Sequence, residues 1–125
     1  IKNDVTFWGF VTDAEKFKFL ARAHILINPS IREGWGLVNI EANSVGTPVV
    51  AYNSQGLVDS VKTGMNGVIV KENSPMALAN EIDNLLKDNV KFTRLQKGAL
   101  NWSHQFVWAD SQKKSLKLIA SICKK

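Results

Sequence analysis

Short apolar runs alternate with segments of helical periodicity along the chain. The apolar runs are continuous, which is typical of strands covered on both faces of a parallel sheet, and they fall at residues 5–8, 25–27, 49–52 and 68–70. Apolar residues at helical spacing fall at 12–23, 37–45, 57–62, 74–87, 91–103 and from 108 onward. Strand and helix in series predict the α/β class, with a Rossmann-like parallel sheet and helices on both faces.

Residues at the helix ends agree with this pattern. Thr12 and Glu15 have the spacing of a capping box, in which each side chain accepts a hydrogen bond from the other residue's backbone N–H. Gly46 stands where a helix end favours a left-handed residue. Ser74 and Pro75 form an N-cap and first-turn pair. These signals fix two helix starts and one helix end.

The helix predicted at 37–45 carries a carboxylate on its apolar face. Five apolar residues share that face by helical spacing, namely Leu37, Val38, Ile40, Ala42 and Val45. Glu41 falls among them, while Asn39 and Asn43 lie on the opposite side. Because an unpaired carboxylate is costly to bury, we expect this face to meet a cleft where Glu41 points at hydroxyl or N–H groups. The alternative is a structural ion pair with a Lys or Arg of a neighbouring helix.

The loop before this helix has the features of an anion site. It follows the second predicted strand, and ligands of parallel sheets bind beyond the carboxyl ends of strands. Gly34 and Gly36 allow close approach of the backbone, and the first helical amides, which have no partner within the helix, favour a phosphate or an oxygen-rich group. Glu33 can accept hydrogen bonds from hydroxyls, so the pattern favours a polyhydroxylated nucleotide conjugate. A solvated loop acid and simple turn glycines are the alternatives.

Composition limits the remaining possibilities. A chain of 125 residues with 45% hydrophobic and 22% charged residues has the size and composition of one globular domain. Without a membrane-spanning apolar run, and with a single cysteine, it is expected to be cytoplasmic. The net charge of +5 suits phosphate-bearing ligands or peripheral contact with an anionic membrane surface. We expect no nucleic-acid partner. Because position 1 is Ile, we expect a piece of a longer protein.

Several other residues are expected to be structural. The last predicted helix has an apolar stripe that should pack inward, formed by Leu116, Ile119, Ala120 and Cys123. The tryptophans other than Trp35 should lie mostly in the core, and His24 and His104 should be structural. The lysines of the last segment should form a solvated helix face, namely Lys113, Lys114, Lys117, Lys124 and Lys125.

Three stretches of the sequence resemble a known family. VTFWGFV, PSIREGWGLVNIEANSVGTPVVA and FVWADS are similar to the carboxyl-terminal domain of the GT-B-fold retaining glycosyltransferases of group 1 (family 4), which are marked by two glutamates separated by seven residues. The likeness covers nearly the whole chain and is sharpest in the second stretch. It implies that residues 1–125 are an incomplete carboxyl-terminal half of a GT-B fold that binds a nucleotide-sugar donor, such as a UDP- or GDP-sugar.

The resemblance implies roles for the residues that match the family's motif. Glu33 would be the catalytic residue beside the donor sugar, where it stabilises an oxocarbenium-like state. Glu41 would bind the ribose hydroxyls, and Gly9 and Phe10 would lie near the base. Backbone contacts to the sugar and diphosphate would come from Gly34, Trp35, Gly36 and Leu37. The family transfers a hexosyl unit with retention, usually without a bound metal, so no metal or other cofactor is implied.

Departures from the family pattern lead to further expectations. Trp35 replaces the commoner Phe and changes the size of the pocket wall. The family's diphosphate-binding Arg and Lys and its first two strands precede residue 1, and Arg32 does not match that pair. Because those strands would lie between segments 5–8 and 25–27, we expect an interrupted sheet and self-association or loose folding. A saccharide or lipid-linked acceptor would bind the missing amino-terminal domain, so the chain alone should be inactive.

Two other functions fit the same fold class. A nucleotide-sugar epimerase would share the fold but would lack the EGWGL signature. A non-catalytic, flavodoxin-like nucleotide-binding module would need an acidic cluster at strand ends, and Asp13 and Asp59 do not have that spacing. Both alternatives therefore rank below the glycosyltransferase.

Overall fold

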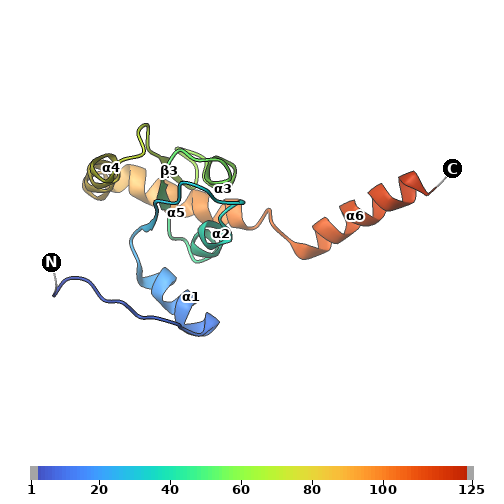
Figure 1. Ribbon diagram of the computed structural model, residues 1–125, viewed down its shortest axis with the longest axis horizontal. Helices are drawn as coiled ribbons and strands as arrows, with labels where there is room; N and C mark the ends of the chain where they lie inside the picture. The colour runs from blue at the N-terminus through green and yellow to red at the C-terminus, as the bar shows by residue number, and fades with distance from the viewer. Residues whose placement is uncertain (1–2, 124–125) are drawn as a thin grey trace.

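The computed structural model describes residues 3–123 (Figure 1). Its described strands form one parallel sheet in the order β1 (Leu26–Asn28), β2 (Val49–Ala51) and β3 (Gly67–Ile69). Leu26, Val49 and Gly67 are aligned across the sheet. The helices of the described part are α1 (Asp13–Arg22), α2 (Leu37–Ser44), α3 (Leu57–Ser60), α4 (Pro75–Lys87), α5 (Asn89–Ser103) and α6 (Trp108–Ile122).

Side chains of β2 alternate between two buried clusters. Val50 packs with residues of β3, α4 and α5 in a cluster of Val50, Tyr52, Val68, Val70, Leu78, Leu85 and Leu95. Val49 and Ala51 pack with residues of α1, α2 and α3 in a cluster of Leu20, Ala42, Val49, Ala51, Leu57 and Val61. Successive residues of a strand point to opposite faces of a sheet. The predicted α/β fold, with helices on both faces of a parallel sheet, is therefore confirmed.

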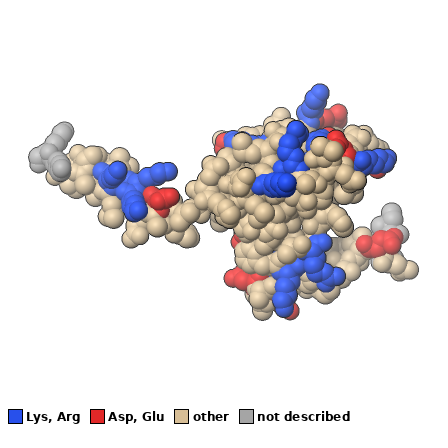
Figure 2. All heavy atoms as spheres, turned by 180° about the vertical axis from the view of Figure 1, so that it is seen from behind, with Lys and Arg blue, Asp and Glu red and all other residues tan. Residues whose placement is uncertain are grey.

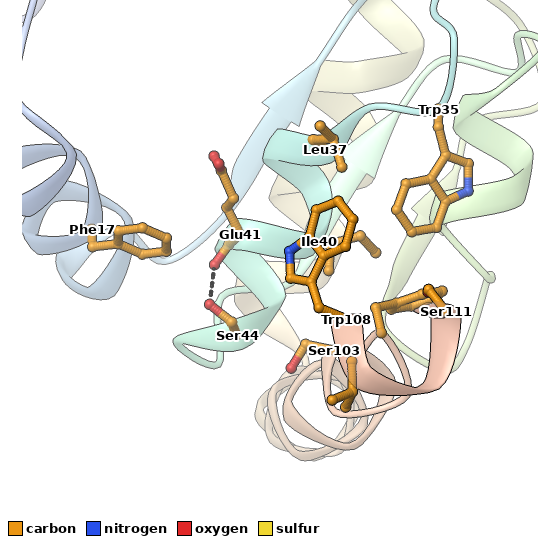
Figure 3. A pocket seen from close by; sticks show the side chains of 11 residues that line it. Phe17, Trp35, Leu37, Ile40, Glu41, Ser44, Ser103, Trp108 and Ser111 are labelled. Carbon is orange, nitrogen blue, oxygen red and sulfur yellow. Dashed lines mark hydrogen bonds between the residues drawn. The ribbon is translucent and has the colours of Figure 1, made fainter. Parts of the chain in front are cut away.

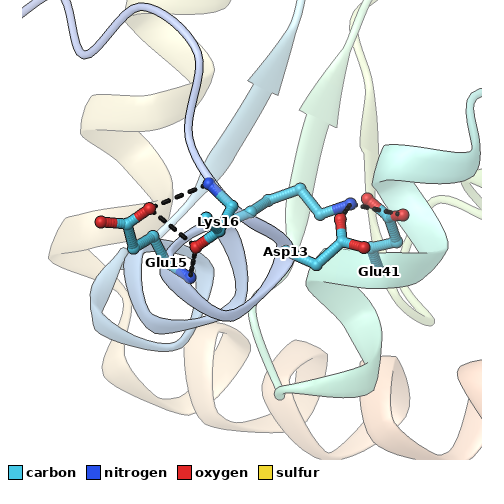
Figure 4. Close-up of polar contacts among 5 residues, drawn as sticks. Asp13, Glu15, Lys16 and Glu41 are labelled. Carbon is cyan, nitrogen blue, oxygen red and sulfur yellow. Dashed lines mark hydrogen bonds and ion pairs between the residues drawn. The ribbon is translucent and has the colours of Figure 1, made fainter.

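The predicted capping box is present at the start of α1 (Figure 4). The backbone N–H of Glu15 donates to Thr12 Oγ1 at 3.3 Å, and the backbone N–H of Thr12 donates to Glu15 Oε2 at 2.9 Å. Hydrogen bonds from the Thr12 side chain and then its backbone hold the pKa of Glu15 below its ordinary value. Their stabilisation is present above the ordinary Glu pKa and is lost as the pH falls through the lowered pKa.

The first predicted strand, at residues 5–8, does not form. This segment precedes α1 outside the sheet, and the Phe7 side chain is 93% exposed. Trp8 is 63% exposed and packs on Phe19 of α1, with ring centroids 4.5 Å apart. A strand requires a neighbour for its backbone N–H and C=O groups, and residues 5–8 have none in the described chain. The strands β1, β2 and β3 are contiguous, and segment 5–8 lies apart from them, so the interruption expected between segments 5–8 and 25–27 stays a prediction.

The last helix does not pack inward as its apolar stripe suggested. Figure 1 shows α6 extending away from the sheet and the other helices, and none of its described residues is buried. Trp108 is 90% exposed, Ile122 is 66% exposed, and Cys123 is exposed. An amphipathic pattern identifies the face that favours burial but not the surface that covers it. The expectations that Cys123, Trp8 and Trp108 lie in the core are therefore wrong.

Basic side chains are spread over the surface. On the face shown in Figure 2, Lys and Arg occur in separate groups over the body of the molecule and on α6. Lys113, Lys114 and Lys117 are exposed, as expected for a solvated helix face, whereas Lys124 and Lys125 lie outside the described residues. Within residues 3–123, no helix is long and apolar enough to cross a membrane.

Candidate functional site: the cleft beside helix α2

A cleft of about 590 Å³ lies along the outer side of α2 (Figure 3). Its walls come from α1, the loop before α2, α2 itself and the junction between α5 and α6. The lining residues are Phe17, Trp35, Leu37, Ile40, Glu41, Ser44, Ser103, Phe106, Val107, Trp108 and Ser111. Most of this lining is apolar, and Glu41 is its only acidic side chain among the described residues.

Helix α2 turns Leu37, Ile40 and Glu41 to the cleft and its asparagines to the core. Leu37 is 69% exposed, whereas Asn39 and Asn43 are fully buried. Leu37, Ile40 and Glu41 therefore meet a cleft, as the helical spacing predicted, whereas Ala42 and Val45 of the same predicted face pack in the core. The burial of the asparagine side was not foreseen from the sequence, because unpaired amides are costly to bury.

Hydrogen bonds between side chains explain the buried asparagines. Asn28, at the end of β1, donates from Nδ2 to Asn39 Oδ1 at 3.0 Å, and Asn39 donates to Ser60 Oγ at 2.9 Å. Asn66 donates to Asn43 Oδ1 at 2.6 Å and to the carbonyl oxygen of Ser60 at 2.9 Å. Because buried amides favour positions where all their partners are supplied, this network fixes the orientation of α2 relative to β1 and α3.

The loop between β1 and α2 rests on the loop before α3. Ser54 Oγ donates to the carbonyl oxygen of Ser30 at 2.8 Å. Gly56 has a φ of +85°, and a Cβ added there would collide with the carbonyl oxygens of Glu33 and Gly34. Glycine is therefore required at Gly56 both for its backbone conformation and for this close approach. The contact places the loop that carries Glu33 over the amino-terminal end of α3.

The amino-terminal end of α2 is open. Gly36 is its N-cap residue with a φ of +80°, and no described side chain caps the helix. A Cβ at Gly36 would lie 2.6 Å from Asn39 Nδ2, so a larger residue would disturb the buried network. The amide of Asn39 donates to the carbonyl oxygen of Gly36 at 2.9 Å. The earlier amides of the first turn and the positive end of the helix dipole remain available to an oxygen-rich group.

Glu41 is held by a lysine of the neighbouring helix (Figure 4). Lys16 Nζ lies 2.9 Å from Glu41 Oε1 and 3.2 Å from Asp13 Oδ1. The hydrogen bond with Glu41, followed by that with Asp13, raises the pKa of Lys16. The stabilisation that this contact gives through Lys16 is complete below the ordinary Lys pKa and is lost as the pH rises through the raised pKa, so Lys16 is charged at neutral pH. The ion-pair alternative for Glu41 is thus present, on a side chain that also lines the cleft.

Of the other predicted site residues, some line the cleft and some lie outside it. Trp35 lines the cleft and packs edge-on against Phe106, with ring centroids 4.8 Å apart. Glu33 is half-buried in the adjoining loop and does not line the cleft. Gly9 and Phe10 are exposed before α1, and Phe10 is 98% exposed. The structure therefore does not bring Gly9 and Phe10 to the cleft.

Sequence reasoning missed two parts of the cleft. Lys16 lies 25 positions before its partner Glu41, and nothing in the local pattern distinguishes it from Lys18. Phe106 and Trp108 come from the end of the chain, where their spacing indicates only an apolar surface. Within residues 3–123, no group of three His, Cys, Asp or Glu side chains is arranged to hold a metal ion.

Comparison with known proteins identifies the family. Residues 1–102 match the family described as Glycosyl transferases group 1. The chain belongs to this family. It is 38% identical over 89 residues to D-inositol 3-phosphate glycosyltransferase 1 of Catenulispora acidiphila, a match that covers 71% of this chain and 21% of that protein.

Solved structures of other glycosyltransferases have the same fold. Alr3699/HepE of Anabaena in complex with UDP superposes with a TM-score of 0.86 at 27% identity, over 96% of this chain and 33% of that chain. Sucrose-phosphate synthase of Thermosynechococcus elongatus gives a TM-score of 0.86 at 30% identity, over 96% of this chain and 30% of that chain. These neighbours are GT-B glycosyltransferases. This member of group 1 thus spans about a third of their length.

Proposed function

We propose that this group 1 domain binds the nucleotide-sugar donor of a retaining glycosyltransferase that transfers a hexosyl unit to an acceptor. The observation that carries the proposal is the position of Glu41, which lines a cleft on the helix whose open amino-terminal end follows the Gly34–Gly36 loop. Alr3699/HepE, which has the same fold, has been solved in complex with UDP and with UDP-glucose. These complexes support a nucleoside diphosphate as the bound group.

The chemistry of the site assigns each part of the donor a partner. The amides from Trp35 to Val38 would hold the diphosphate, because free amides and a helix dipole stabilise negative charge as the leaving group departs. The Glu41 carboxylate would accept hydrogen bonds from the ribose hydroxyls. Glu33, eight positions earlier, would face the sugar and stabilise the oxocarbenium-like state, so that the two glutamates act as the Glu-x7-Glu motif of retaining enzymes. No metal ion is needed in this arrangement.

The acceptor would bind outside the residues present here. This chain covers only 21% of the inositol-phosphate glycosyltransferase that it resembles, and the cleft beside α2 is open to solvent. A longer protein would supply the rest of the active site and the saccharide or lipid-linked acceptor, with contact to a membrane surface if the acceptor is a lipid. We therefore expect donor binding, but not transfer, from these 125 residues.

Glu41→Ala should weaken the binding of UDP or GDP to the chain. The loss should be about 1.5 to 3 kcal/mol, roughly 10- to 150-fold in Kd, which is the range for a hydrogen bond to a charged group. Isothermal titration calorimetry measures this loss directly. Affinity equal to that of the unmodified chain would remove Glu41 from the site.

Glu81→Ala is the matched control for this measurement. Glu81 forms a comparable half-buried ion pair on α4, with Lys91 Nζ at 2.8 Å, and it does not line the cleft. Its replacement removes the same charge and leaves a lysine unpaired in the same way. Nucleotide affinity should therefore stay within about twofold of the unmodified chain, as expected for a change outside the site.

A further inference from the structure

The side chain of Lys16 connects α1 to the carboxylate that lines the cleft. Figure 4 shows it extending from α1 to Glu41 on α2, with Asp13 beside its amino group. The side chains of Lys16 and Glu41 are each 31% exposed, whereas Asp13 is 91% exposed. Phe17 and Glu41 line the cleft but Lys16 does not, so the lysine approaches the carboxylate from outside the cleft.

The geometry leaves half of the carboxylate available. Lys16 contacts Oε1 of Glu41, and no described residue donates a hydrogen bond to Oε2. A carboxylate offers about four acceptor positions on its two oxygens. One oxygen can therefore be fixed by the lysine while the other, and the unused positions of the first, accept hydroxyl groups from a ligand in the cleft.

The main consequence of this pair concerns orientation rather than stability. Ion pairs that are partly exposed contribute little to folding. A free glutamate samples several rotamers, and ordering it when a ligand binds reduces the affinity. Lys16 is anchored in α1, and its ion pair selects one of these Glu41 rotamers before a ligand binds. Outer-shell partners orient the ligating groups of binding sites in the same way.

We propose that Lys16 is a positioning residue for nucleotide binding, which fixes the Glu41 carboxylate so that it accepts the ribose hydroxyls of a nucleoside diphosphate. This inference rests on the proposed donor-binding function. It assigns to a residue of α1 a role in recognising the ribose, although its own amino group does not line the cleft. The effect of Lys16 should therefore depend on the ribose hydroxyls and on Glu41.

The test compares UDP with its 2′,3′-dideoxy analogue by calorimetry on the full 125-residue chain. Lys16→Met keeps most of the length of the side chain and removes its charge. It should weaken UDP binding by about 3- to 10-fold through the lost preorganisation, and it should leave binding of the dideoxy analogue within about twofold, since that ligand has no hydroxyls for Glu41 to accept. In a chain that already carries Glu41→Gln, Lys16→Met should have no further effect on UDP binding.

Lys18→Met controls for the loss of one positive charge from α1. Lys18 is exposed on the same helix and forms none of the ion pairs with Glu41 or Asp13. Its replacement should change the affinity for both ligands by less than about twofold, because solvent screens an exposed charge. Thermal unfolding of Lys16→Met and of Lys18→Met, each compared with the unmodified chain, shows whether the two variants are folded.

The possible outcomes separate this inference from the function on which it rests. An equal loss for UDP and the dideoxy analogue would overturn the positioning role, because Lys16 would then act on the phosphates or on folding. Unchanged UDP affinity in Lys16→Met, with affinity lost in Glu41→Ala, would overturn the positioning role alone. Absence of UDP and GDP binding to the unmodified chain would contradict the proposed function, and the role of Lys16 with it.

Discussion

Gly56→Ala is expected to destabilise the chain by about 2 to 6 kcal/mol. A non-glycine residue at a φ of +85° is strained, and the new Cβ would collide with the carbonyl oxygens of Glu33 and Gly34. The loop before α2 would have to move away from α3, so nucleotide binding should be lost together with stability. Urea denaturation followed by tryptophan fluorescence measures the change in the free energy of unfolding.

Gly64→Ala distinguishes the two causes of this loss. Gly64 has a φ of +82°, but a Cβ added there would meet no atom within 4 Å. Its replacement should cost only the backbone strain, about 1 to 2 kcal/mol, and should leave nucleotide affinity unchanged. If Gly56→Ala destabilises the chain no more than Gly64→Ala does, the loop does not rest on Gly56 as described.

Asn66→Ala is expected to lower the free energy of unfolding by about 3 kcal/mol or more. Asn66 is fully buried, and its side chain is hydrogen-bonded to Asn43 Oδ1, to the carbonyl oxygen of Ser60 and to the backbone N–H of Lys62. Alanine removes all three contacts, and each buried group left without a partner costs about 1 to 3 kcal/mol. The same denaturation experiment measures this effect.

Asn101→Ala is the control for Asn66→Ala. Asn101 is an exposed residue of α5, so its replacement should change the free energy of unfolding by no more than about 0.5 kcal/mol. A similarly small effect at Asn66 would show that the buried amides are not held as a network. It would also remove the reason for the fixed orientation of α2 and of Glu41.

The order of elements could be predicted because each signal is local. The capping box of Thr12 and Glu15, the N-cap at Ser74 and the apolar runs that became β1, β2 and β3 all depend on residues close together in the sequence. Ser74 Oγ accepts from the backbone N–H of Ala77 at 3.2 Å, as its position indicated. Local agreement of this kind is what makes a sequence specify its fold.

The sequence could not show what covers an apolar surface. The segment at 5–8 and the stripe on α6 have the composition of buried elements, yet Phe7 is 93% exposed and Ile119 is 57% exposed. Burial requires a partner surface. Trp8 packs on Phe19 but is still 63% exposed, and no described residue of α6 is buried. Exposed apolar faces favour association. The self-association that the missing strands led us to expect stays a prediction.

Part of the candidate site was predictable and part was not. The loop glycines and Glu41 could be found from their spacing on one short segment. The pairing of Lys16 with Glu41 and the contact of Asn66 with Asn43 join residues 25 and 23 positions apart, respectively. Such contacts depend on how α1 and the segment after α3 pack against α2, which no local pattern specifies.

The most direct test of the account is a titration of the isotopically labelled chain with UDP, GDP and ADP, followed by amide NMR shifts. If the donor binds at the cleft, one nucleotide should shift the amides of residues 33–37 and of Glu41. A second hollow, of about 530 Å³, lies on α5 and is lined by Asn89, Val90, Thr93, Arg94 and Lys97. Shifts centred on that basic surface, or no shifts with any nucleotide at millimolar concentration, would contradict donor binding at the cleft beside α2.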